Sequence, residues 1–483
     1  MMLWTLIKKE VLETMLDLRF WVVSVLFLLL IPLSLLVSRE DYEQRLADYQ
    51  QSHQMYRDNY KQVSSNMEAQ GFRPPAPQSV FASGITSNLP DIVITSQSGL
   101  VRAIKNPAVD NVQGILLGKV DLQFIATYVI SLAALMLTYN CVSGERGNGT
   151  LRLMIANSLP RGHIIGIKVA SAYMTLWIPL TLALTVGILV LQASSSISLV
   201  PGPLLNAFGC ILLCMALFTL CMILIGTCIS TMTVSATTSM VVALLVWVIL
   251  VIGIPKTSPM IAQIIYPIES QNVVQMRTQL AAKALDDELN QKEIELYLKC
   301  REGHGITDKN NFDQSREEAA MAEYDEQIPP IRLEYEQRKT QQIRRINQDY
   351  ENKRTSQTAI ATNLSRLSPV SCFTYLATGL ANTGAGEVKR FWQNAERFQH
   401  QVKQEIYDKI KVKTYSIGCG SMSQVEYAEG FDRETAVLPD IDYHYGTLAE
   451  ILQEGFWDVT LLSVFPTALF ALAFISFLKY DVR

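Results

Sequence analysis

Six long runs of apolar residues, separated by polar stretches, organise the chain. None of these runs contains a Lys, Arg, Asp or Glu. Because the hydrocarbon core of a bilayer is about 30 Å thick, a helix needs roughly 20 apolar residues to cross it. The pattern therefore predicts six transmembrane helices, at residues 20–37, 122–142, 170–191, 205–230, 234–254 and 459–478.

The residues before the first run have a pattern of their own. Apolar residues at helical spacing (Leu3, Ile7, Val11, Met15 and Leu18) lie opposite charged ones (Lys8, Lys9, Glu10, Glu13 and Asp17). This pattern predicts an interfacial amphipathic helix over residues 1–19. The alternative is a signal peptide, but the leading segment contains acids as well as bases, and no A-x-A-like site follows Val37.

The distribution of Lys and Arg predicts the orientation in the membrane. The loop 143–169 carries Arg146, Arg152, Arg161 and Lys168 against the single acid Glu145, whereas the loop 192–204 carries no charge. Short loops rich in Lys and Arg stay in the cytoplasm. Both termini, including the tail 479–483, are therefore expected to be cytoplasmic, in a multi-pass protein of the cytoplasmic (inner) membrane.

Two long loops, 38–121 and 255–456, are then expected outside. The first should continue the first span as a helix to about Gln70 and then hold a short strand, Ile92 to Thr95. The second is long enough for a domain. Apolar residues at helical spacing in 273–300 and 312–367 predict an antiparallel helical arm, and the alternative is a merely solvated helix.

The rest of the second loop is less regular. We expect turns at 368–386, a helix at 387–413 and irregular structure at 414–445. The predicted fold class is thus an all-α polytopic membrane protein, with six transmembrane helices, a large, mainly helical extracytoplasmic domain and a minor β element.

Composition and charge narrow the function classes. Charged residues make up 18% of the chain, below the value of about 25% for soluble proteins. A net charge of −4 without a long basic run excludes a nucleic-acid footprint. Only Cys300, Cys372 and Cys419 lie outside the apolar runs, and which two of them, if any, form a disulfide is not readable from the sequence. The absence of charge from the spans argues against an ion-driven transporter.

The most informative motif lies in the loop 143–169. It reads Ser143-Gly144-Glu145-Arg146-Gly147-Asn148-Gly149-Thr150-Leu151-Arg152, followed by Pro160-Arg161 and Gly166-Ile167-Lys168. Three glycines permit a sharp turn, and a short helix is expected from Leu151 until Pro160 stops it. Because both ends of this element join membrane helices, a force applied to it would pass to spans two and three.

This pattern resembles the cytoplasmic coupling segment of type 2 permease subunits of ABC exporters, in a subgroup with enlarged extracytoplasmic loops. The resemblance implies a separate ABC ATPase subunit that binds ATP and Mg²⁺, and a second copy of the chain or a related permease. The ATPase-interface residues that it implies are Glu145, Arg146, Gly149, Thr150, Leu151, Arg152 and Arg161. The alternative is an ordinary basic loop that obeys the positive-inside rule.

No motif in the chain predicts catalysis, a cofactor or a metal site. Residues 162–168 lack the G-x-x-x-x-G-K-[ST] spacing of a P-loop, and the five histidines are scattered singly. We therefore predict a non-enzymatic permease subunit of an ATP-driven exporter, surrounded by membrane lipids. The alternative is mechanotransmission without transport, in which the ATPase stroke moves the outer arm against an envelope partner. A membrane-anchored scaffold without an ATPase is a third interpretation, and it leaves the coupling pattern unexplained.

Overall fold

The computed structural model describes residues 2–59, 68–95, 101–104, 119–149, 161–193, 202–306, 314–417, 420–427 and 439–479. The chain divides into two compact units. One contains Met1–Pro255 and Arg366–Arg483, and the other contains Lys256–Ser365. The stretch 255–456, expected as one outer domain, is therefore shared between the two units.

Six helices among the described residues are long and apolar enough to cross a membrane. This finding confirms the predicted fold class. The spans are formed by α2 (Leu18–Asn59), by α4 (Leu122–Ile125), η4 (Ala126–Ile130), α5 (Ser131–Thr138) and α6 (Ser143–Asn148), by α8 (Arg161–Gln192), by α9 (Pro203–Met232), by α10 (Ala236–Val248), η5 (Ile249–Gly253) and α11 (Ile254–Ile265), and by α17 (Phe456–Leu478). Both η4 and η5 are π-helical turns.

The membrane helices pack into one bundle around an apolar core. In it α2 lies against α8, and α9 lies against both α5 and α17. Two glycines let these helices approach closely: a Cβ at Gly187 would lie 2.5 Å from Leu35 Cδ1, and one at Gly226 would overlap the Thr138 hydroxyl. Small residues at such crossings allow the close van der Waals packing that holds helices together in a bilayer.

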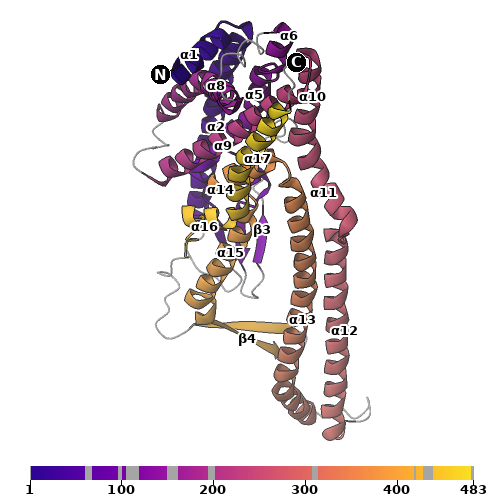
Figure 1. The fold of residues 1–483 in the computed structure, drawn as a ribbon. Coiled ribbons are helices and arrows are strands. Elements are labelled where there is room, and N and C mark those ends of the chain that lie inside the picture. The colour runs from indigo at the N-terminus through magenta and orange to yellow at the C-terminus, as the bar shows by residue number, and fades with distance from the viewer. Residues whose placement is uncertain are drawn as a thin grey trace. The chain divides into compact units, whose positions relative to one another are not determined.

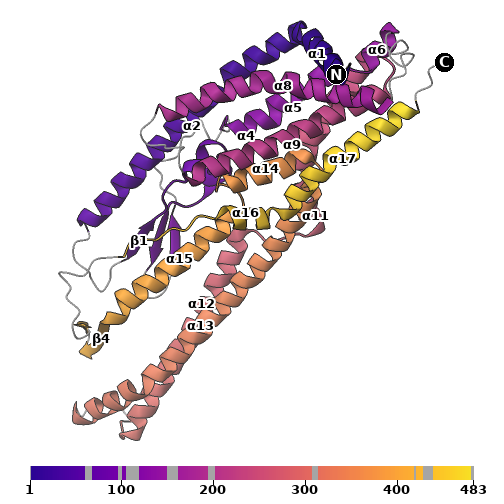
Figure 2. The same ribbon diagram turned by 60° about the vertical axis from the view of Figure 1, so that its left-hand side comes forward.

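The two ends of this bundle differ. The N-terminal helix α1 (Met2–Met15), α6 and the C-terminal end of α17 lie at one end (Figures 1 and 2). Near the other end lies a small antiparallel sheet of β1 (Ala69–Phe72), β2 (Ile92–Thr95) and β3 (Val101–Ile104), in that order. The strand expected at Ile92 to Thr95 is thereby confirmed.

The elements that follow the second unit depart from the sequence expectation. Residues 369–380 form a buried helix, α14 (Pro369–Leu380), where turns were expected. It begins with Ser368 as N-cap and Pro369 in the first turn, a pairing that favours helix initiation. The helix α15 (Gly386–Glu405) ends earlier than expected. After η6 (Tyr407–Lys409), the strands β4 (Ile410–Ile417) and β5 (Gly420–Tyr427) form an antiparallel hairpin in place of irregular structure.

The helix α15 covers the three-stranded sheet. Its buried Phe391 and Phe398 pack with Ala69 of β1 and Val93 of β2 in a second apolar cluster. The chain then continues to α16 (Leu448–Glu454), which precedes α17. The part of the first unit that carries the sheet thus has a small core of its own, in line with the predicted minor β element.

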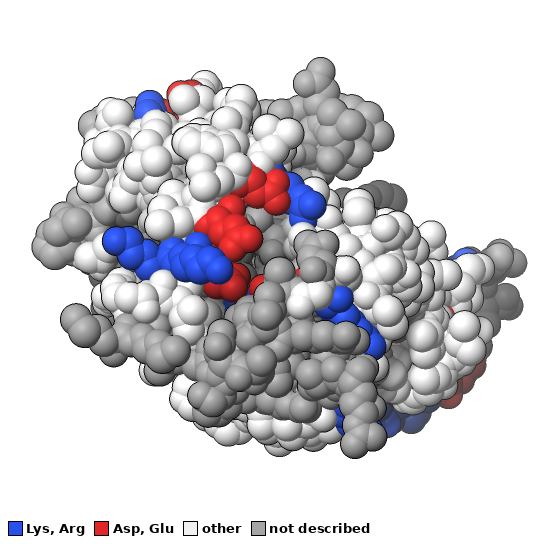
Figure 3. Space-filling view, turned by 45° about the horizontal axis from the view of Figure 1, so that its top comes forward, with Lys and Arg blue, Asp and Glu red and all other residues white. Residues whose placement is uncertain are grey.

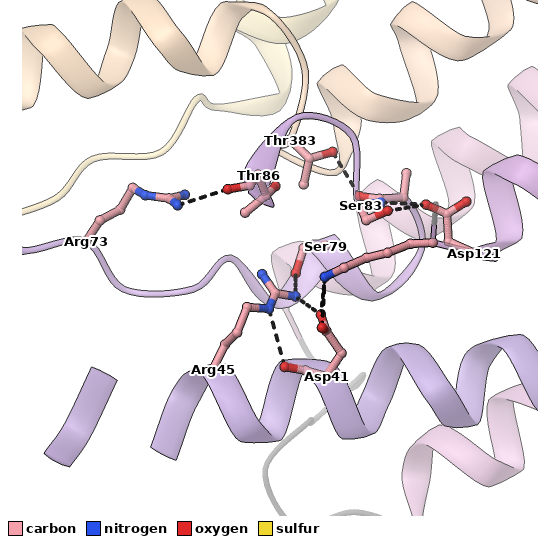
Figure 4. A network of polar contacts seen from close by, with 10 residues as sticks. Asp41, Arg45, Arg73, Ser79, Ser83, Thr86, Asp121 and Thr383 are labelled. Atoms are coloured by element: carbon pink, nitrogen blue, oxygen red, sulfur yellow. Dashed lines mark hydrogen bonds and ion pairs between the residues drawn. The ribbon is translucent and has the colours of Figure 1, made fainter. Parts of the chain in front are cut away.

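A polar network fixes the extension of α2 to the loops beside it (Figure 4). The Arg45 guanidinium donates to the Ser79 hydroxyl at 3.1 Å, and Lys119 donates to the Asp41 carboxylate at 2.8 Å. Asp41 and Arg45 also form an ion pair one helical turn apart, at 2.9 Å. These contacts hold the η1 turn (Pro77–Val80) and the approach to α4 against α2.

Asp121 and Thr383 complete this network. The Asp121 carboxylate caps α4 by accepting from Phe124 N, and it also accepts from the amide and hydroxyl of Ser83 at 2.7 Å. The Thr383 hydroxyl donates to the Ala82 carbonyl at 2.8 Å. The start of the second span is therefore bonded to the loop before η2 (Thr86–Asn88), and that loop is bonded to the turn after α14.

The second unit is an antiparallel pair of long helices, α12 (Gln271–Gly303) and α13 (Gln314–Ser365), as the arm prediction required. Polar contacts run between the two helices: Lys339 to Asp286 at 2.7 Å and Arg332 to Glu293 at 2.6 Å. The helix α13 continues through Pro329 and Pro330.

A buried carboxylate joins α15 to the segment before α16. The Glu387 residue is 1% exposed, and its Oε1 accepts from the Tyr443 hydroxyl at 2.8 Å. Its Oε2 has no hydrogen-bond partner among the described residues. Burial raises the pKa of the Glu387 carboxyl above its ordinary value, while the Tyr443 bond and the charges of Arg390 and Arg73 oppose the rise. The ionised carboxylate is thus destabilised in the folded state.

We predict that Glu387→Gln raises the melting temperature at neutral pH. Because the folded-state pKa lies above the unfolded-state pKa, the unfolded carboxyl loses its proton first, and a rise in pH through this window favours unfolding. Glutamine keeps an oxygen acceptor for Tyr443 and removes the charge. The gain should shrink as the pH falls through the ordinary Glu value of about 4.3, because below it the carboxyl is protonated in both states.

The control for this prediction is Glu396→Gln, at an exposed position of the same helix. Thermal unfolding of both variants and the parent is measured from about pH 4 to about pH 8. An equal, pH-independent effect in the two variants would contradict the assigned role of Glu387.

Candidate functional site

The second span ends in the short helix α6, and the expected three-glycine turn was wrong. Gly144 and Gly147 lie within α6, and of the three glycines only Gly149 has a left-handed backbone, with φ of 75°. Glycine commonly ends a helix in this conformation because it has no Cβ. One glycine therefore turns the chain, and the other two belong to the helix.

Lys168 lies at the centre of an ion cluster beside α6, between Glu145 and Glu10. Its Nζ donates to Glu145 Oε1 of α6 at 2.6 Å and to Glu10 Oε1 of α1 at 3.3 Å. The Lys168 side chain is 2% exposed, and the two carboxylates are 23% and 22% exposed. A buried ammonium needs such paired, hydrogen-bonded charges to offset its desolvation. The cluster therefore ties α6, α1 and α8 together.

The Ser230 hydroxyl and the Arg146 guanidinium fix α6 to α9 and to the junction between α9 and α10. The amides of Val142 and Ser143 donate to the Ser230 hydroxyl near the end of α9, at 3.0 and 3.1 Å. Arg146 donates to the carbonyl of Thr233, between α9 and α10, at 3.5 Å. A displacement of α6 is thus transmitted through bonded contacts to four other helices or their junctions.

The predicted interface residues have different positions. Glu145 is directed toward Lys168, Arg146 is directed toward the α9–α10 junction, and Gly149 is exposed at the end of α6. Thr150, Leu151 and Arg152 lie outside the described residues, as does the short helix expected before Pro160. Arg161 is the first residue of α8, and its side chain is also outside the described part.

The sequence analysis did not assign the partners of Glu145. Lys168 was treated as a positive charge of the loop and as the last residue of the motif, and Glu10 as part of an amphipathic helix. The sequence does contain a sign that Lys168 is buried and paired, because its neighbours are apolar. These neighbours, Ile164, Ile165, Ile167 and Val169, are all buried in the structure. A lysine within such an apolar stretch requires a counter-ion, although the stretch does not say which acid supplies it.

Charged side chains gather on this end of the bundle. Figure 3 shows acidic and basic residues side by side on this end. In the described part of the chain, no group of three or more His, Cys, Asp or Glu residues could hold a metal ion. The arrangement holds helices together by paired charges and presents the short helix α6 at the surface.

A second polar junction lies at the start of α17. Arg366, the residue after α13, donates to Asp458 from Nε at 2.7 Å and from Nη2 at 2.8 Å, and the Asp458 side chain is 4% exposed. The Ser368 hydroxyl donates to the Leu250 carbonyl at 2.7 Å, within the π-helical turn η5 where the α-helical ladder is interrupted. The chain that leaves the helical pair is thus fixed to two membrane helices.

Comparison with protein families gives one match that covers almost the whole chain. Residues 4–482 match the model of the ABC-2 family transporter protein. No curated protein matches the chain.

Proposed function

Because this chain belongs to the ABC-2 family of transporter proteins, we propose that it is the permease subunit of an ATP-driven exporter. In this proposal a separate ABC ATPase binds ATP and Mg²⁺, and this chain performs no catalysis. A second copy of the chain, or a related permease, completes the membrane part. The direction of transport is part of the proposal.

The observation that carries the proposal is the Lys168 cluster. It bonds α6 to α1 and α8 at the end of the bundle where the C-terminal end of α17 also lies. The excess of Lys and Arg in the loop 143–169 favours the cytoplasm for this end. An ATPase beneath the membrane would then meet α6 and the residues up to Pro160.

The proposed mechanism follows from these bonds. Closure of the ATPase pair would push the segment that begins with α6. Because Lys168 and Ser230 bond α6 to α8 and α9, the displacement would move these spans together with α5, from which α6 continues. Interfaces and packed helices have discrete arrangements, so a small displacement at one end would switch the bundle between two states.

We predict that Gly147→Trp weakens retention of the ATPase at least tenfold. Gly147 is exposed, and a Cβ there meets nothing within 4 Å among the described residues, so a side chain can extend from this position away from the bundle. A bulky side chain on the docking face would block contact. The measurement is the amount of ATPase that copurifies with a tagged chain, together with the rate of ATP hydrolysis.

The matched control is Gly303→Trp, at a glycine of α12 that also has no neighbour within 4 Å of its Cβ. This position is expected outside the membrane and should leave ATPase retention unchanged. Parental retention and hydrolysis in Gly147→Trp would count against the proposed interface.

A second candidate function is supported by the junction at Arg366 and Ser368. The arm follows η5 of the fifth span in sequence, and the residues directly after it, Arg366 and Ser368, are bonded to Asp458 of the sixth span and to Leu250 of η5. Movement of these spans would therefore reach both attachments of the arm. This arrangement favours mechanotransmission, in which the arm acts on an envelope partner.

Removal of the arm tip distinguishes the two candidates. Arg277 and Ile346 line the same small hollow of the helical pair, so residues 278–345 can be replaced by a short Gly-Ser loop without separating the remaining helices. An exporter should retain ATPase assembly and transport after this deletion. A mechanotransmitter should retain ATPase assembly but lose its envelope phenotype.

A further inference from the structure

An apolar hollow of about 490 Å³ opens between α1, the start of α8 and the end of α17. Its lining includes Ile7 of α1, Gly166 and Ile167 of α8, and Phe470 and Phe474 of α17. Nothing lies within 4 Å of a Cβ built on Gly166, so this glycine forms open floor. The volume is within the range of about 300–1,000 Å³ that is typical of ligand sites.

The surroundings of the hollow favour a lipid chain over water or a polar ligand. Two of its walls are transmembrane helices, and the third is an amphipathic helix of the kind that lies at the membrane surface. Trp4 lies about one helical turn before Ile7 and is 62% exposed, as expected for an anchor at the headgroup level.

The charge around the hollow favours an anionic headgroup. His163 lies on its lining, Lys8 directly follows Ile7, and Lys479 lies a little over one helical turn beyond Phe474. None of these three side chains forms an ion pair with another described residue. Basic groups between membrane helices on the cytoplasmic side are a known feature of sites for anionic lipids.

We propose that an anionic phospholipid occupies this hollow, with one acyl chain against Gly166 and its headgroup near Lys8, His163 and Lys479. The lipid fills the space between α1, α8 and α17 next to Lys168, and so stabilises the contact of α1 with α8. This inference rests on the expected placement of α8 and α17 across the bilayer and of α1 at its surface. It does not depend on the ATPase, so the two proposals fail separately.

Native mass spectrometry of the full chain, released from nanodiscs of phosphatidylglycerol or of phosphatidylcholine with the same acyl chains, tests the proposal. The parent chain should retain phosphatidylglycerol through delipidation at least tenfold better than Gly166→Leu, whose side chain fills the hollow. The control is Gly209→Leu in α9, where a Cβ also meets nothing within 4 Å, and it should retain lipid like the parent. Parental retention in Gly166→Leu would overturn the site.

Two further measurements test the headgroup and the occupant. The double variant Lys8→Gln with Lys479→Gln should lose the preference for phosphatidylglycerol over phosphatidylcholine, and equal retention of the two lipids by the parent would overturn an anionic headgroup. A photoreactive benzoylphenylalanine in place of Phe470 should form an adduct of lipid mass in native membranes. A covalent dimer, or an adduct with the ATPase, would show that protein occupies the hollow and would overturn the proposal.

Discussion

Lys168→Met is expected to abolish coupled transport and to destabilise the end of the bundle that carries α6. The substitution removes an ammonium whose side chain is 2% exposed and leaves Glu145 without the partner at 2.6 Å. Removing one partner of a buried ion pair costs about 3–5 kcal/mol. Thermal unfolding and ATPase-coupled transport of the purified complex measure both effects.

Two comparisons separate the ion cluster from general damage. Lys9→Met changes an exposed lysine of α1 and should have an effect within about 0.5 kcal/mol. The double variant Lys168→Met with Glu145→Met removes both members of the closest pair, and it should be more stable than Lys168→Met alone. A double variant less stable than the single one would contradict the pairing.

Asp458→Asn is expected to release the chain after the arm from the sixth span. The bidentate Arg366–Asp458 contact is almost fully buried on the Asp458 side, so loss of the carboxylate should cost about 3 kcal/mol. The melting temperature should fall, and the arm should become more susceptible to limited proteolysis. Arg366→Lys should give a smaller but measurable loss, because an ammonium cannot form the bidentate contact.

The matched control is Asp349→Asn. Asp349 forms an ion pair with Lys353 at 2.7 Å, one turn apart on α13, and its side chain is 62% exposed. Exposed pairs of this kind contribute about 0.3–0.5 kcal/mol. A similar effect of Asp349→Asn and Asp458→Asn on proteolysis of the arm would count against a special role for the Asp458 junction.

The membrane helices could be predicted from the sequence because the signal is local. A run such as Leu205 to Ser230 contains no charged side chain, and a helix of this length and composition is compatible with the hydrocarbon core of a bilayer. The helical pair could also be predicted, since apolar spacing and charged positions repeat along both of its helices. The helix α14 was missed although its start signal, Ser368 followed by Pro369, is present in the sequence. Most side chains of α14 are buried, so its sequence lacks the alternation of an apolar and a polar face that predicts a surface helix.

The candidate site could be predicted only in part, because its contacts join distant segments. The motif beginning at Glu145 identified the segment, but Lys168 bonds Glu10 across 158 residues of sequence. Arg366 and Asp458 are likewise 92 residues apart. Periodicity within a segment shows which residues face a neighbour, and it does not show which neighbour that is.

Photo-crosslinking from α6 tests most directly whether this segment is driven by an ATPase. A cysteine at Gly147, which adds little bulk to the docking face, and a cysteine at the exposed α15 residue Trp392 as control are each labelled in assembled membranes with a short thiol-specific photo-crosslinker, which is activated with and without ATP. The ATPase subunit should be captured from position 147 and not from position 392, with a yield that changes with nucleotide. Capture of the ATPase from 392, or none from 147 in any nucleotide state, would contradict the proposed coupling.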